Sequence, residues 1–583
     1  MKYQKWHIGT ASEQDTALLK EAGYPSLLAT VLAARGITTS EAAAEALERE
    51  TSLTISPMLM RDMDKAVARI QKALANDETI AVFGDYDVDG ITSTVLLLDY
   101  LKNCGAKCLR YIPRRIEDGY GLSKDAIQGL RDKGATLMIT VDCGITGNEE
   151  IDFAASIGMD VVVTDHHECK ENLPRAVAVV DPHRPDDAYP FKYLAGVGVA
   201  LKLVLALGGP DRENALFARY CTLAAIGTIA DVMRMEGENR TIVSCGLAAL
   251  NHTDFVGIHA LLKEAGLLGK PITSIQIGFV LSPRINAAGR MRMDENDENA
   301  SPSGGHAAVE LLIEGNESIA EEFGSVIDAY NQDRKSIDRS VTQEAHDYIE
   351  GNPEMKALKS TVIYNPRWMK GIVGIVASRL IETYYRPTVV LTMSNGFVTG
   401  SARSVPGFDL YQAVESCSDL LENFGGHMYA AGLTMRPENV GEFTRRFNAY
   451  VEENIDPQML VPQVDIDSEL LFSDITPAFR KDLNRFQPFG PGNTAPVFAT
   501  CGVSNHGDAK LVGMECEHLR MDLMQRQKPN TKIQAIAFQQ PTHYEWVRSG
   551  RPIDVCYQIV ENHYRGTVTT QLRIKDIKPV LNR

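Results

Sequence analysis

Three aspartates at alternate positions are the residues in this chain that most clearly point to chemistry. Asp85, Asp87 and Asp89 lie in the segment Val82-Phe83-Gly84-Asp85-Tyr86-Asp87-Val88-Asp89-Gly90. Carboxylates packed this closely repel one another, so the segment makes little sense without cations. Hard divalent ions are the natural partners of such oxygen ligands. We therefore predict that this segment contributes to a divalent metal site.

Two other interpretations of the aspartate segment have to be weighed. The spacing is also that of the start of an EF-hand calcium loop, which requires a glutamate at its twelfth position and a helix before the loop. Leu96 stands at that position, and the apolar run 79–83 favours a strand. The other alternative is a solvated turn that binds nothing, and it loses weight once the later ligand-type residues are considered.

The elements around the segment predict an α/β fold. We expect a helix over 63–76, followed by alternating strands and helices. The expected strands cover 79–83, 107–112, 137–141, 160–163 and 177–180, and the expected helices cover 91–103, 123–133 and 148–158. This alternation is typical of a doubly wound, mostly parallel sheet. In such sheets, ligands bind at the carboxyl ends of the strands.

Polar residues follow several of these strands, and parallel strands bring them to one rim. Asp142-Cys143-Gly144 comes after the third expected strand and Thr164-Asp165-His166-His167-Glu168 after the fourth. Asp181-Pro182-His183-Arg184 follows the fifth. Farther on, Asp231 ends an apolar segment, where a lone carboxylate would be costly to bury without a cation. Together these residues favour the metal site.

Composition sets broad limits on the function. The chain has 583 residues, of which 44% are hydrophobic and 23% charged, as in globular proteins of several domains. Its net charge of −17 argues against a protein that coats nucleic acid non-specifically, although a locally basic channel is compatible with it. The ten cysteines have no CxxC spacing, so neither a zinc site nor a disulfide framework is indicated. We expect a cytoplasmic protein without membrane segments.

The motifs together resemble a known family. The aspartate segment, Val141-Asp142-Cys143-Gly144, Asp165-His166-His167 and Asp231 are similar to the four motifs of the DHH phosphoesterase superfamily. Gly425-Gly426-His427 with Ala430-Ala431-Gly432 resembles the signature of the accompanying DHHA1 domain. Four further segments resemble the RecJ branch, the single-stranded-DNA-specific exonucleases: 282–290, 374–379, 400–404 and 489–493. The chain departs from the family at Met369, where a histidine is usual, and in an acidic insertion, Met293–Ser303.

The resemblance implies a sequence of domains. An N-terminal helical segment (1–60) would precede a DHH catalytic domain (61–315). A connecting helix (316–350), whose charge run is typical of a solvated face, would lead to a smaller α/β DHHA1 domain (351–457). The chain would end in an all-β domain of OB type (458–583), a fold that commonly grips single strands.

The resemblance also implies roles for the polar residues. Two Mn²⁺ or Mg²⁺ ions would be held by Asp87, Asp89, Asp142, His166 and Asp231, with Asp142 favoured as the bridging ligand. His167 would polarise the scissile phosphate or protonate the leaving oxygen, and Asp85 would orient a ligand or water. If the segment is extended, His167 should point away from His166, because neighbours along a strand face opposite sides.

A second set of residues is expected to contact DNA. The resemblance places Ser401, Arg403 and Arg115 at a terminal 5′-phosphate, which the planar fork of arginine suits. The glycine turn could cradle a phosphate with its backbone amides. The complete expected set is Arg115, Asn286, Arg290, Ser401, Arg403, Gly425, Gly426 and His427.

The expected function is a 5′-to-3′ exonuclease that hydrolyses single-stranded DNA to 5′-mononucleotides in DNA repair and recombination. The polarity depends on the resemblance alone. We expect a monomer whose partner is single-stranded DNA, with single-strand-binding protein or a helicase as further candidates. One alternative is a DHH enzyme that acts on short oligonucleotides or cyclic dinucleotides, and the OB tail argues against it. The other is a non-catalytic DNA-binding scaffold, against which stands the presence of every expected metal ligand.

Overall fold

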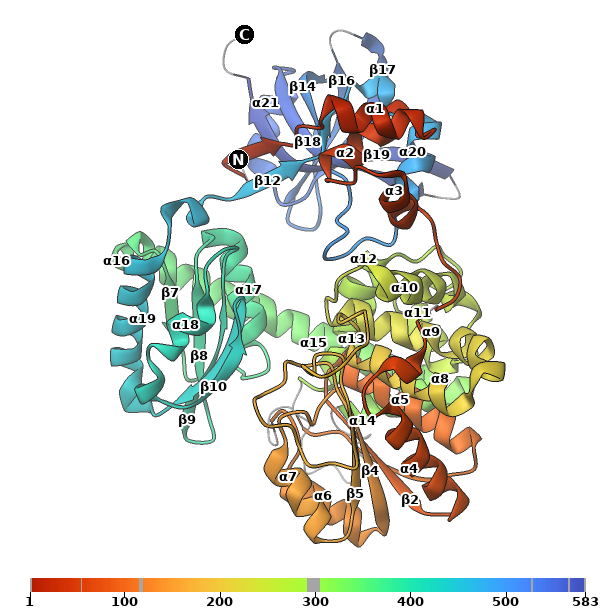
Figure 1. Ribbon diagram of the computed structural model, residues 1–583. Helices are drawn as coiled ribbons and strands as arrows, with labels where there is room; N and C mark the ends of the chain where they lie inside the picture. Colours follow the sequence, from red (N-terminus) through yellow and green to blue (C-terminus); the bar gives the residue numbers. More distant parts are fainter. Residues whose placement is uncertain are drawn as a thin grey trace.

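The computed structural model describes residues 3–53, 55–114, 119–290, 305–525, 528–564 and 567–580. These residues form three modules, of which a long helix joins the first two, and Figure 1 shows the modules arranged around a common centre. Within the described part of the chain, no helix is both long and apolar enough to cross a membrane.

The first module is built on a five-stranded parallel sheet, which confirms the predicted fold class. Its strands are β2 (Thr79–Gly84), β3 (Lys107–Tyr111), β4 (Ala135–Val141), β5 (Asp160–Thr164) and β6 (Ala178–Val180). Their order is β3-β2-β4-β5-β6, and all the pairs are parallel. The chain reverses its direction of travel across the sheet between β2 and β4, which makes this pair a topological switch point.

Helices cover both faces of this sheet, because successive strand side chains point to opposite sides. Ile80 and Val82 pack with α4 (Met63–Ala75), α5 (Val88–Asn103) and α8 (Gly196–Gly208). Ala81 and Phe83 pack on the other face with α6 (Lys124–Asp132) and α7 (Asn148–Ser156). Figure 1 shows the two helix layers on either side of β2, β4 and β5.

A helical layer follows the sheet and leads to the second module. It contains α9 (Glu213–Ala230), α10 (Gly237–Ala249), α11 (Val256–Glu264), α12 (Ser274–Gln276), the π-helical turn η4 (Ile277–Leu281), α13 (Ser282–Ala288) and α14 (Gly305–Ile313). The connecting helix α15 (Glu317–Glu350) then spans 34 residues, or about 50 Å at 1.5 Å per residue. Its charge run is only partly solvated: Lys335 and Arg339 are exposed, but Arg334 and Asp338 are buried.

The second module is a smaller α/β unit. Its sheet has the order β10-β11-β9-β8-β7 and is antiparallel apart from the β7–β8 pair. The strands are β7 (Thr361–Tyr364), β8 (Thr388–Ser394), β9 (Phe397–Arg403), β10 (Leu421–His427) and β11 (Ala430–Met435). One face packs on α17 (Val373–Tyr384), and the other on α18 (Leu410–Glu415) and α19 (Val440–Asn454). The short α16 (Pro353–Ala357) follows α15.

The third module is a closed barrel of OB type, as predicted. The sheet order is β13-β14-β18-β19-β17-β16-β15, and a β14–β16 pairing closes it. The strands are β13 (Ser468–Glu469), β14 (Phe498–Asn505), β15 (Lys510–Val512), β16 (His518–Gln525), β17 (Lys528–Ala537), β18 (Ile553–Tyr564) and β19 (Thr567–Pro579). The module also contains helices α20 (Pro477–Asn484) and α21 (Tyr544–Arg548), so it is not purely β.

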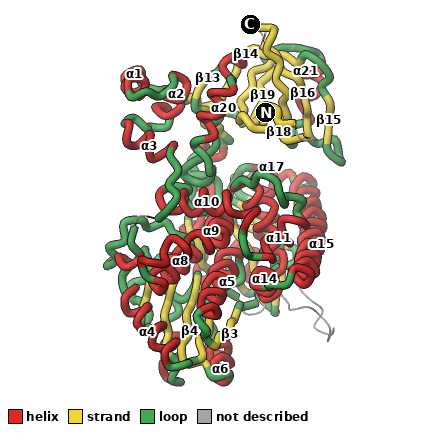
Figure 2. Tube along the Cα trace, turned by 90° about the vertical axis from the view of Figure 1, so that its right-hand side faces the viewer, coloured by secondary structure: helices red, strands yellow, loops and turns green. Residues whose placement is uncertain are grey.

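The N-terminal segment belongs to the barrel in space, although the whole catalytic module separates them in sequence. The short helices predicted there are present as α1 (Glu13–Glu21), α2 (Ser26–Ala34) and α3 (Ser40–Leu47). An unpredicted strand, β1 (Lys5–Ile8), pairs in parallel with β12 (Gln463–Ile466). Figures 1 and 2 both show α1–α3 beside α20. The Arg35 guanidinium donates to Asp467 at 2.6 Å, and the Trp6 indole donates to Asp576 at 2.9 Å.

Replacing Leu28 by alanine is expected to destabilise the barrel, because Leu28 is fully buried in the apolar core that the N-terminal helices share with it. Large-to-small changes in such cores cost about 2–5 kcal/mol. Hydrogen exchange should therefore accelerate across β14, β18 and β19. The matched change at Leu18, which is 51% exposed on α1, should have little effect. Acceleration confined to α1–α3 would contradict the shared core.

Candidate metal centre and nucleic-acid contacts

The aspartate segment is a tight turn between β2 and α5. Asp87 caps α5, and its Oδ1 accepts the N–H groups of Asp89 at 2.9 Å and Gly90 at 3.1 Å. A Cβ atom on Gly90 would lie 2.5 Å from the backbone oxygen of Asp85, so only glycine fits there. The turn is therefore folded back closely enough to bring its aspartates into one small volume.

The start of α8 packs against two of the expected ligands. Asp89 Oδ2 accepts the N–H of Gly196 at 2.7 Å, and its Oδ1 accepts that of Val197 at 2.9 Å. A Cβ atom on Gly196 would lie 2.6 Å from Cβ of Asp142. The helix N-terminus favours negative charge, so α8 stabilises the Asp89 carboxylate while leaving no space beside Asp142.

His166 lies among carboxylates from three different elements. Its Nε2 is 3.1 Å from Asp142 Oδ1, 3.6 Å from Asp231 Oδ2 and 3.8 Å from Asp89 Oδ2. Asp142 follows β4, Asp231 caps the C-terminus of α9, and Asp89 begins α5. Tertiary structure thus brings together residues that are far apart in sequence.

Three groups of side chains could each hold a metal ion. In every group the potential ligand atoms lie within 4.8 Å of one another. The groups are Asp142 with His166 and His167, Asp89 with His166 and Asp231, and Asp85 with Asp87 and Asp142. Because Asp142 and His166 each belong to two groups, the groups form one continuous cluster. It contains every residue predicted as a ligand or catalytic group, and Asp85 lies in it as a possible ligand.

The electrostatics of the cluster favour a bound cation. Burial, followed by the charge of Asp87, raises the pKa of Asp89 to about 7. Burial and the neighbouring carboxylates raise the pKa values of Asp142 and Asp231 well above the ordinary range. Burial and the nearby His167 lower the pKa of His166 to about 3, so its imidazole is neutral and can act as a ligand.

Unsatisfied atoms support the same conclusion. Among the described residues, Asp142 Oδ1 and both ring nitrogens of His166 have no hydrogen-bond partner, although they are buried. Buried polar atoms of this kind are rare unless an ion or water satisfies them. Carboxylate oxygens with one imidazole suit Mg²⁺ or Mn²⁺. The residues present therefore fit the two-ion centre expected from the sequence.

The predicted orientation of His167 is wrong. β5 ends at Thr164, so His166 and His167 lie beyond the strand, and strand alternation does not apply to them. Their ring centroids are 4.5 Å apart. Burial alone would lower the pKa of His167, but a hydrogen bond between its Nδ1 and Asp165 Oδ1 at 2.7 Å and the charge of Asp165 outweigh burial. Together with Asp231 and Asp87 they raise this pKa to about 9.

Two site residues were not selected from the sequence. Asp165 is fully buried, and its carboxylate also accepts the N–H groups of Ile145 at 2.9 Å and His166 at 2.8 Å. Its place directly before the two histidines was the available signal. The Tyr120 hydroxyl lies 3.2 Å from His167 Nδ1, and nothing in the sequence pattern indicated this contact.

The end of β6 does not join the cluster in the way that the strand pattern suggested. The three ligand groups found among the described residues do not include Asp181 or His183. The guanidinium of Arg184 donates to Asp62 and Asp186, at 2.8 Å in each case. This rim segment thus holds the edge of the sheet to the start of α4.

Two of the residues expected at a terminal phosphate, Ser401 and Arg403, lie with the glycine turn on the sheet of the second module. Arg403 donates to Ser401 Oγ at 2.8 Å along β9. Across the strands, Ser401 faces Gly432, which pairs with Gly425, while Arg403 faces Ala430, which pairs with His427. Gly426 lies between the two pairs in β10.

The N-terminus of α17 adjoins this set. A Cβ atom on Gly374 would lie 3.1 Å from Ser401 Oγ and 3.3 Å from Arg403 Nη2. Burial and the charge of Arg403 lower the pKa of His427, which places these two groups near each other. A helix N-terminus beside arginine and hydroxyl groups is well suited to an anion.

The other expected DNA contacts have mixed positions. Arg290 follows α13 and donates through Nη1 to the Gly371 carbonyl at 2.9 Å, so it joins the first module to the second. Asn286 lies on α13, with its buried Oδ1 lacking a hydrogen-bond partner among the described residues. Arg115 and the insertion Met293–Ser303 lie outside the described residues.

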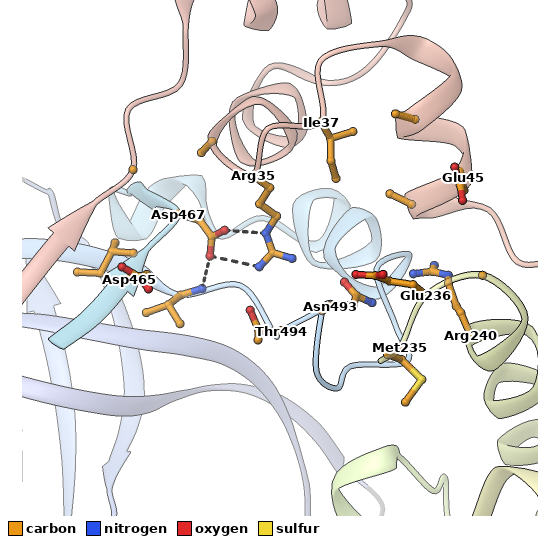
Figure 3. Close-up of a pocket in the computed structure, with 18 of the residues that line it drawn as sticks. Arg35, Ile37, Glu45, Met235, Glu236, Arg240, Asp465, Asp467, Asn493 and Thr494 are labelled. Carbon is orange, nitrogen blue, oxygen red and sulfur yellow. Dashed lines mark hydrogen bonds and ion pairs between the residues drawn. The ribbon is translucent and has the colours of Figure 1, made fainter. Parts of the chain in front are cut away.

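A cavity of about 650 Å³ lies apart from the metal cluster, where the N-terminal segment meets residues 235–240 and the barrel. Figure 3 shows the Arg35–Asp467 pair at its wall, with Glu236, Arg240 and Asn493 on the other side. Acidic and basic side chains are mixed here, and Arg240 donates to the carbonyls of residues 485 and 486. The cavity is thus a junction between modules, and none of the cluster residues line it.

Three family models match the chain. They are the DHH family N-terminal domain over residues 79–228, the DHHA1 domain over 356–453 and the RecJ OB domain over 466–576. These matches confirm the resemblance inferred from the motifs.

Relatives match over almost the entire chain. It is 34% identical over 578 residues to the single-stranded-DNA-specific exonuclease RecJ of Bacillus subtilis, covering 98% of this chain and 70% of that protein. It is 32% identical over 582 residues to the exonuclease of the same name from Escherichia coli, covering 96% and 97%. Its structure is similar to that of RecJ in complex with Mn²⁺ from Thermus thermophilus, with a TM-score of 0.80 and 26% identity over 99% of this chain and 80% of the other.

The metal-free protein is expected to lose stability as the pH rises from about 4 to about 7. A buried acid whose pKa is raised in the folded state, such as Asp89 at about 7, keeps its proton after the unfolded chain has lost it near pH 4. The free energy of unfolding therefore falls as the pH rises through this range. Mn²⁺ should reverse the loss and raise the unfolding temperature by about 5 °C or more.

The variant Asp142→Asn separates these effects. Removing one of the repelling carboxylates should flatten the pH dependence of the chelated protein and also remove the stabilisation by Mn²⁺. Asp125→Asn, on the exposed face of α6, serves as the matched control. An identical pH dependence for Asp142→Asn and the unaltered chain in chelator would refute the electrostatic account of the cluster.

Proposed function

The chain belongs to the RecJ family, and from this premise we propose that it is a metal-dependent exonuclease that degrades single-stranded DNA from the 5′ end to 5′-mononucleotides. The observation that carries the proposal is the continuous cluster of carboxylates and imidazoles at the switch point between β2 and β4. Single-stranded-DNA-specific exonucleases are the named relatives.

The cluster residues would together bind two Mn²⁺ or Mg²⁺ ions. Bound there, these ions supply Lewis-acid polarisation of a phosphodiester and activation of water. The proposed ligands are Asp87, Asp89, Asp142, His166 and Asp231, with Asp85 supporting a ligand or water. Asp142 would be the ligand shared by both ions, since it belongs to two of the three groups and, unlike the imidazole of His166, offers two acceptor oxygens.

His167 is the proposed acid. Asp165 accepts a hydrogen bond from its Nδ1 and favours the doubly protonated ring. The proton at the other ring nitrogen is then available to the scissile phosphate or to the leaving oxygen. Tyr120, whose hydroxyl also contacts Nδ1, helps to keep the ring in place.

The direction of degradation would be set by the second module. Ser401, Arg403 and the N-terminus of α17 offer donors and positive charge to a terminal 5′-phosphate, with Arg115 as a further proposed contact. The turn Gly425–His427, with Asn286 and Arg290 on the catalytic side, would hold the adjoining nucleotides. Anchoring one end of the strand in this way leaves the next phosphodiester at the metal cluster.

The wider setting follows from the same proposal. The barrel would hold the strand farther from its end, as OB folds do. We propose that the protein acts as a monomer in the cytoplasm, in DNA repair and recombination, and that single-strand-binding protein or a helicase supplies its substrate.

Single-stranded DNA labelled at either end tests the proposed reaction. With Mn²⁺ or Mg²⁺, label at the 5′ end should appear early as mononucleotide, whereas label at the 3′ end should appear late. Asp142→Ala should reduce the cleavage rate by at least about 100-fold, because Asp142 belongs to two of the ligand groups. Chelation should reduce the rate by the same factor or more, because it removes the metal ions. Asp125→Ala should leave the rate unchanged. Activity that persists in chelator would refute the mechanism, and cleavage restricted to dinucleotides would favour the short-oligonucleotide alternative.

Arg403→Ala should remove the preference for a phosphorylated end. The unaltered protein should cleave a 5′-phosphorylated strand faster than the same strand with a 5′-hydroxyl, by about 10-fold or more for a charge-assisted contact. In the variant the two rates should converge. Arg436→Ala, at an exposed ion pair just beyond β11, should keep the preference. If Arg403→Ala kept the preference as well, the phosphate would have to bind elsewhere.

A further inference from the structure

The helical segment Ser274–Leu281 exposes an apolar face. Ile277 and Leu281 on one side are fully buried, whereas Phe279 is 80% exposed and Ile275 is 41% exposed. Each pair is spaced by four residues, so the two pairs occupy different faces of the same helical segment. The part that carries Phe279, η4, is π-helical, a rare geometry that is frequent at functional sites.

The segment that carries this face packs against the helix that ends at Asp231. A Cβ atom on Gly278 would be 3.6 Å from Cγ2 of Ile229, so η4 packs against the last turn of α9. Asp231 caps that turn and donates its N–H to the Gly227 carbonyl at 2.9 Å. The residue after it, Val232, is 67% exposed.

Val232 also has an unusual backbone. Its φ of 59° is in the left-handed region, which a β-branched residue adopts only at a cost of about 1–3 kcal/mol. Strain of this kind concentrates at binding and catalytic sites. We call the side chains of Val232, Ile275 and Phe279 the Phe279 surface.

Both segments that carry the Phe279 surface are tied to the chain that leads into the barrel. Ser274 Oγ donates to the Phe489 carbonyl at 2.5 Å, and the N–H of Met235 donates to the Pro491 carbonyl at 2.7 Å. Figure 1 shows α12 between the barrel and the catalytic sheet. A strand held by both the barrel and the metal cluster would therefore pass this region.

We propose that the Phe279 surface stacks against an unpaired base of the bound strand beside Asp231. The inference rests on the proposed function and deepens it by assigning a base contact to this chain. Aromatic side chains stack on any base, because every base has a π-face, so the contact would be independent of sequence. Bases in a duplex are already stacked on their neighbours, so the surface would favour single strands over duplex.

The size of the surface argues for a base as its occupant. A stable protein–protein interface buries about 800 Å² on each partner. Three side chains are too few for such an interface, whereas one nucleobase needs no larger area. A protein partner or a second copy of the chain is therefore the weaker assignment.

Binding measurements with abasic nucleotides test the proposal. The probe is an oligothymidylate bound in the presence of chelator, so that it stays intact, and its affinity is measured by fluorescence anisotropy. A single abasic nucleotide is then moved along the probe from the 5′ end. For the unaltered protein, one or two positions should weaken binding by about 5- to 100-fold, the loss expected for one stacked base.

The variant Phe279→Ala should weaken binding of the intact probe by a similar factor. The affinity of this variant should also become insensitive to an abasic nucleotide at those positions, whereas the affinity of Phe279→Trp should retain the sensitivity. Tyr348→Ala, which removes a 56% exposed aromatic side chain from α15, is the matched control and should change neither quantity. Because Phe279 is so exposed, the unfolding temperatures of the variants should match that of the unaltered protein.

The possible failures are distinguishable. If Phe279→Ala bound the probe as tightly as the unaltered protein does, or if its affinity still depended on the same abasic positions, the stacking proposal would be overturned. Such a result would favour a protein partner at this surface. In one case, Phe279→Ala weakens binding and removes the sensitivity to the abasic nucleotide, but the unaltered protein shows no metal-dependent cleavage. This result would contradict the proposed exonuclease and support the stacking contact. Metal-dependent cleavage without these effects of Phe279→Ala on binding would contradict only the stacking contact.

Discussion

Mutual repulsion among buried carboxylates is the constraint on which this structure depends. The aspartates of one turn meet those that follow β4 and α9 in one cluster, in which Asp85, Asp89 and Asp142 are buried and the Asp231 side chain is 28% exposed. The fold offsets part of the repulsion with backbone amides: the N-terminus of α8 donates to Asp89, and that of α5 to Asp87. The remainder, at Asp142 and Asp231, requires protons or cations. A centre that is unfavourable without metal ions is thereby well prepared to bind them.

The other modules are positioned around this centre by a few specific ties. The long helix α15 packs on the catalytic helices with its first half and on the second module with its last turns. Arg290 bridges the same two modules through the Gly371 carbonyl. The segment Phe489–Asn493 holds the barrel against α12 and the chain that follows Asp231. The residues proposed to bind phosphate and metal ions are consequently joined to one another and to the barrel by direct contacts between the modules.

Much of the local structure was predictable because it follows from local patterns. The strands and helices of the catalytic sheet begin and end within a few residues of the ranges expected from apolar runs. Predictions that depended on extending a local rule were wrong. His167 does not turn away from His166, because the strand ends before them. Arg334 is buried within a charge run that favoured solvent, since it lies between the part of α15 that packs on the catalytic helices and the part that packs on the second module.

The sequence by itself indicated the chemistry of the centre: the carboxylates and imidazoles that follow β2, β4 and β5 are suited to hard cations. It also determined the fold class, because the period of an apolar pattern is a local property. Only the tertiary structure decided that Asp165 supports His167, that β1 pairs with β12 near the other end of the chain, and that the segment carrying the exposed Phe279 packs against the last turn of α9. These features depend on which surfaces meet when distant segments pack, and no pattern within a single segment encodes that.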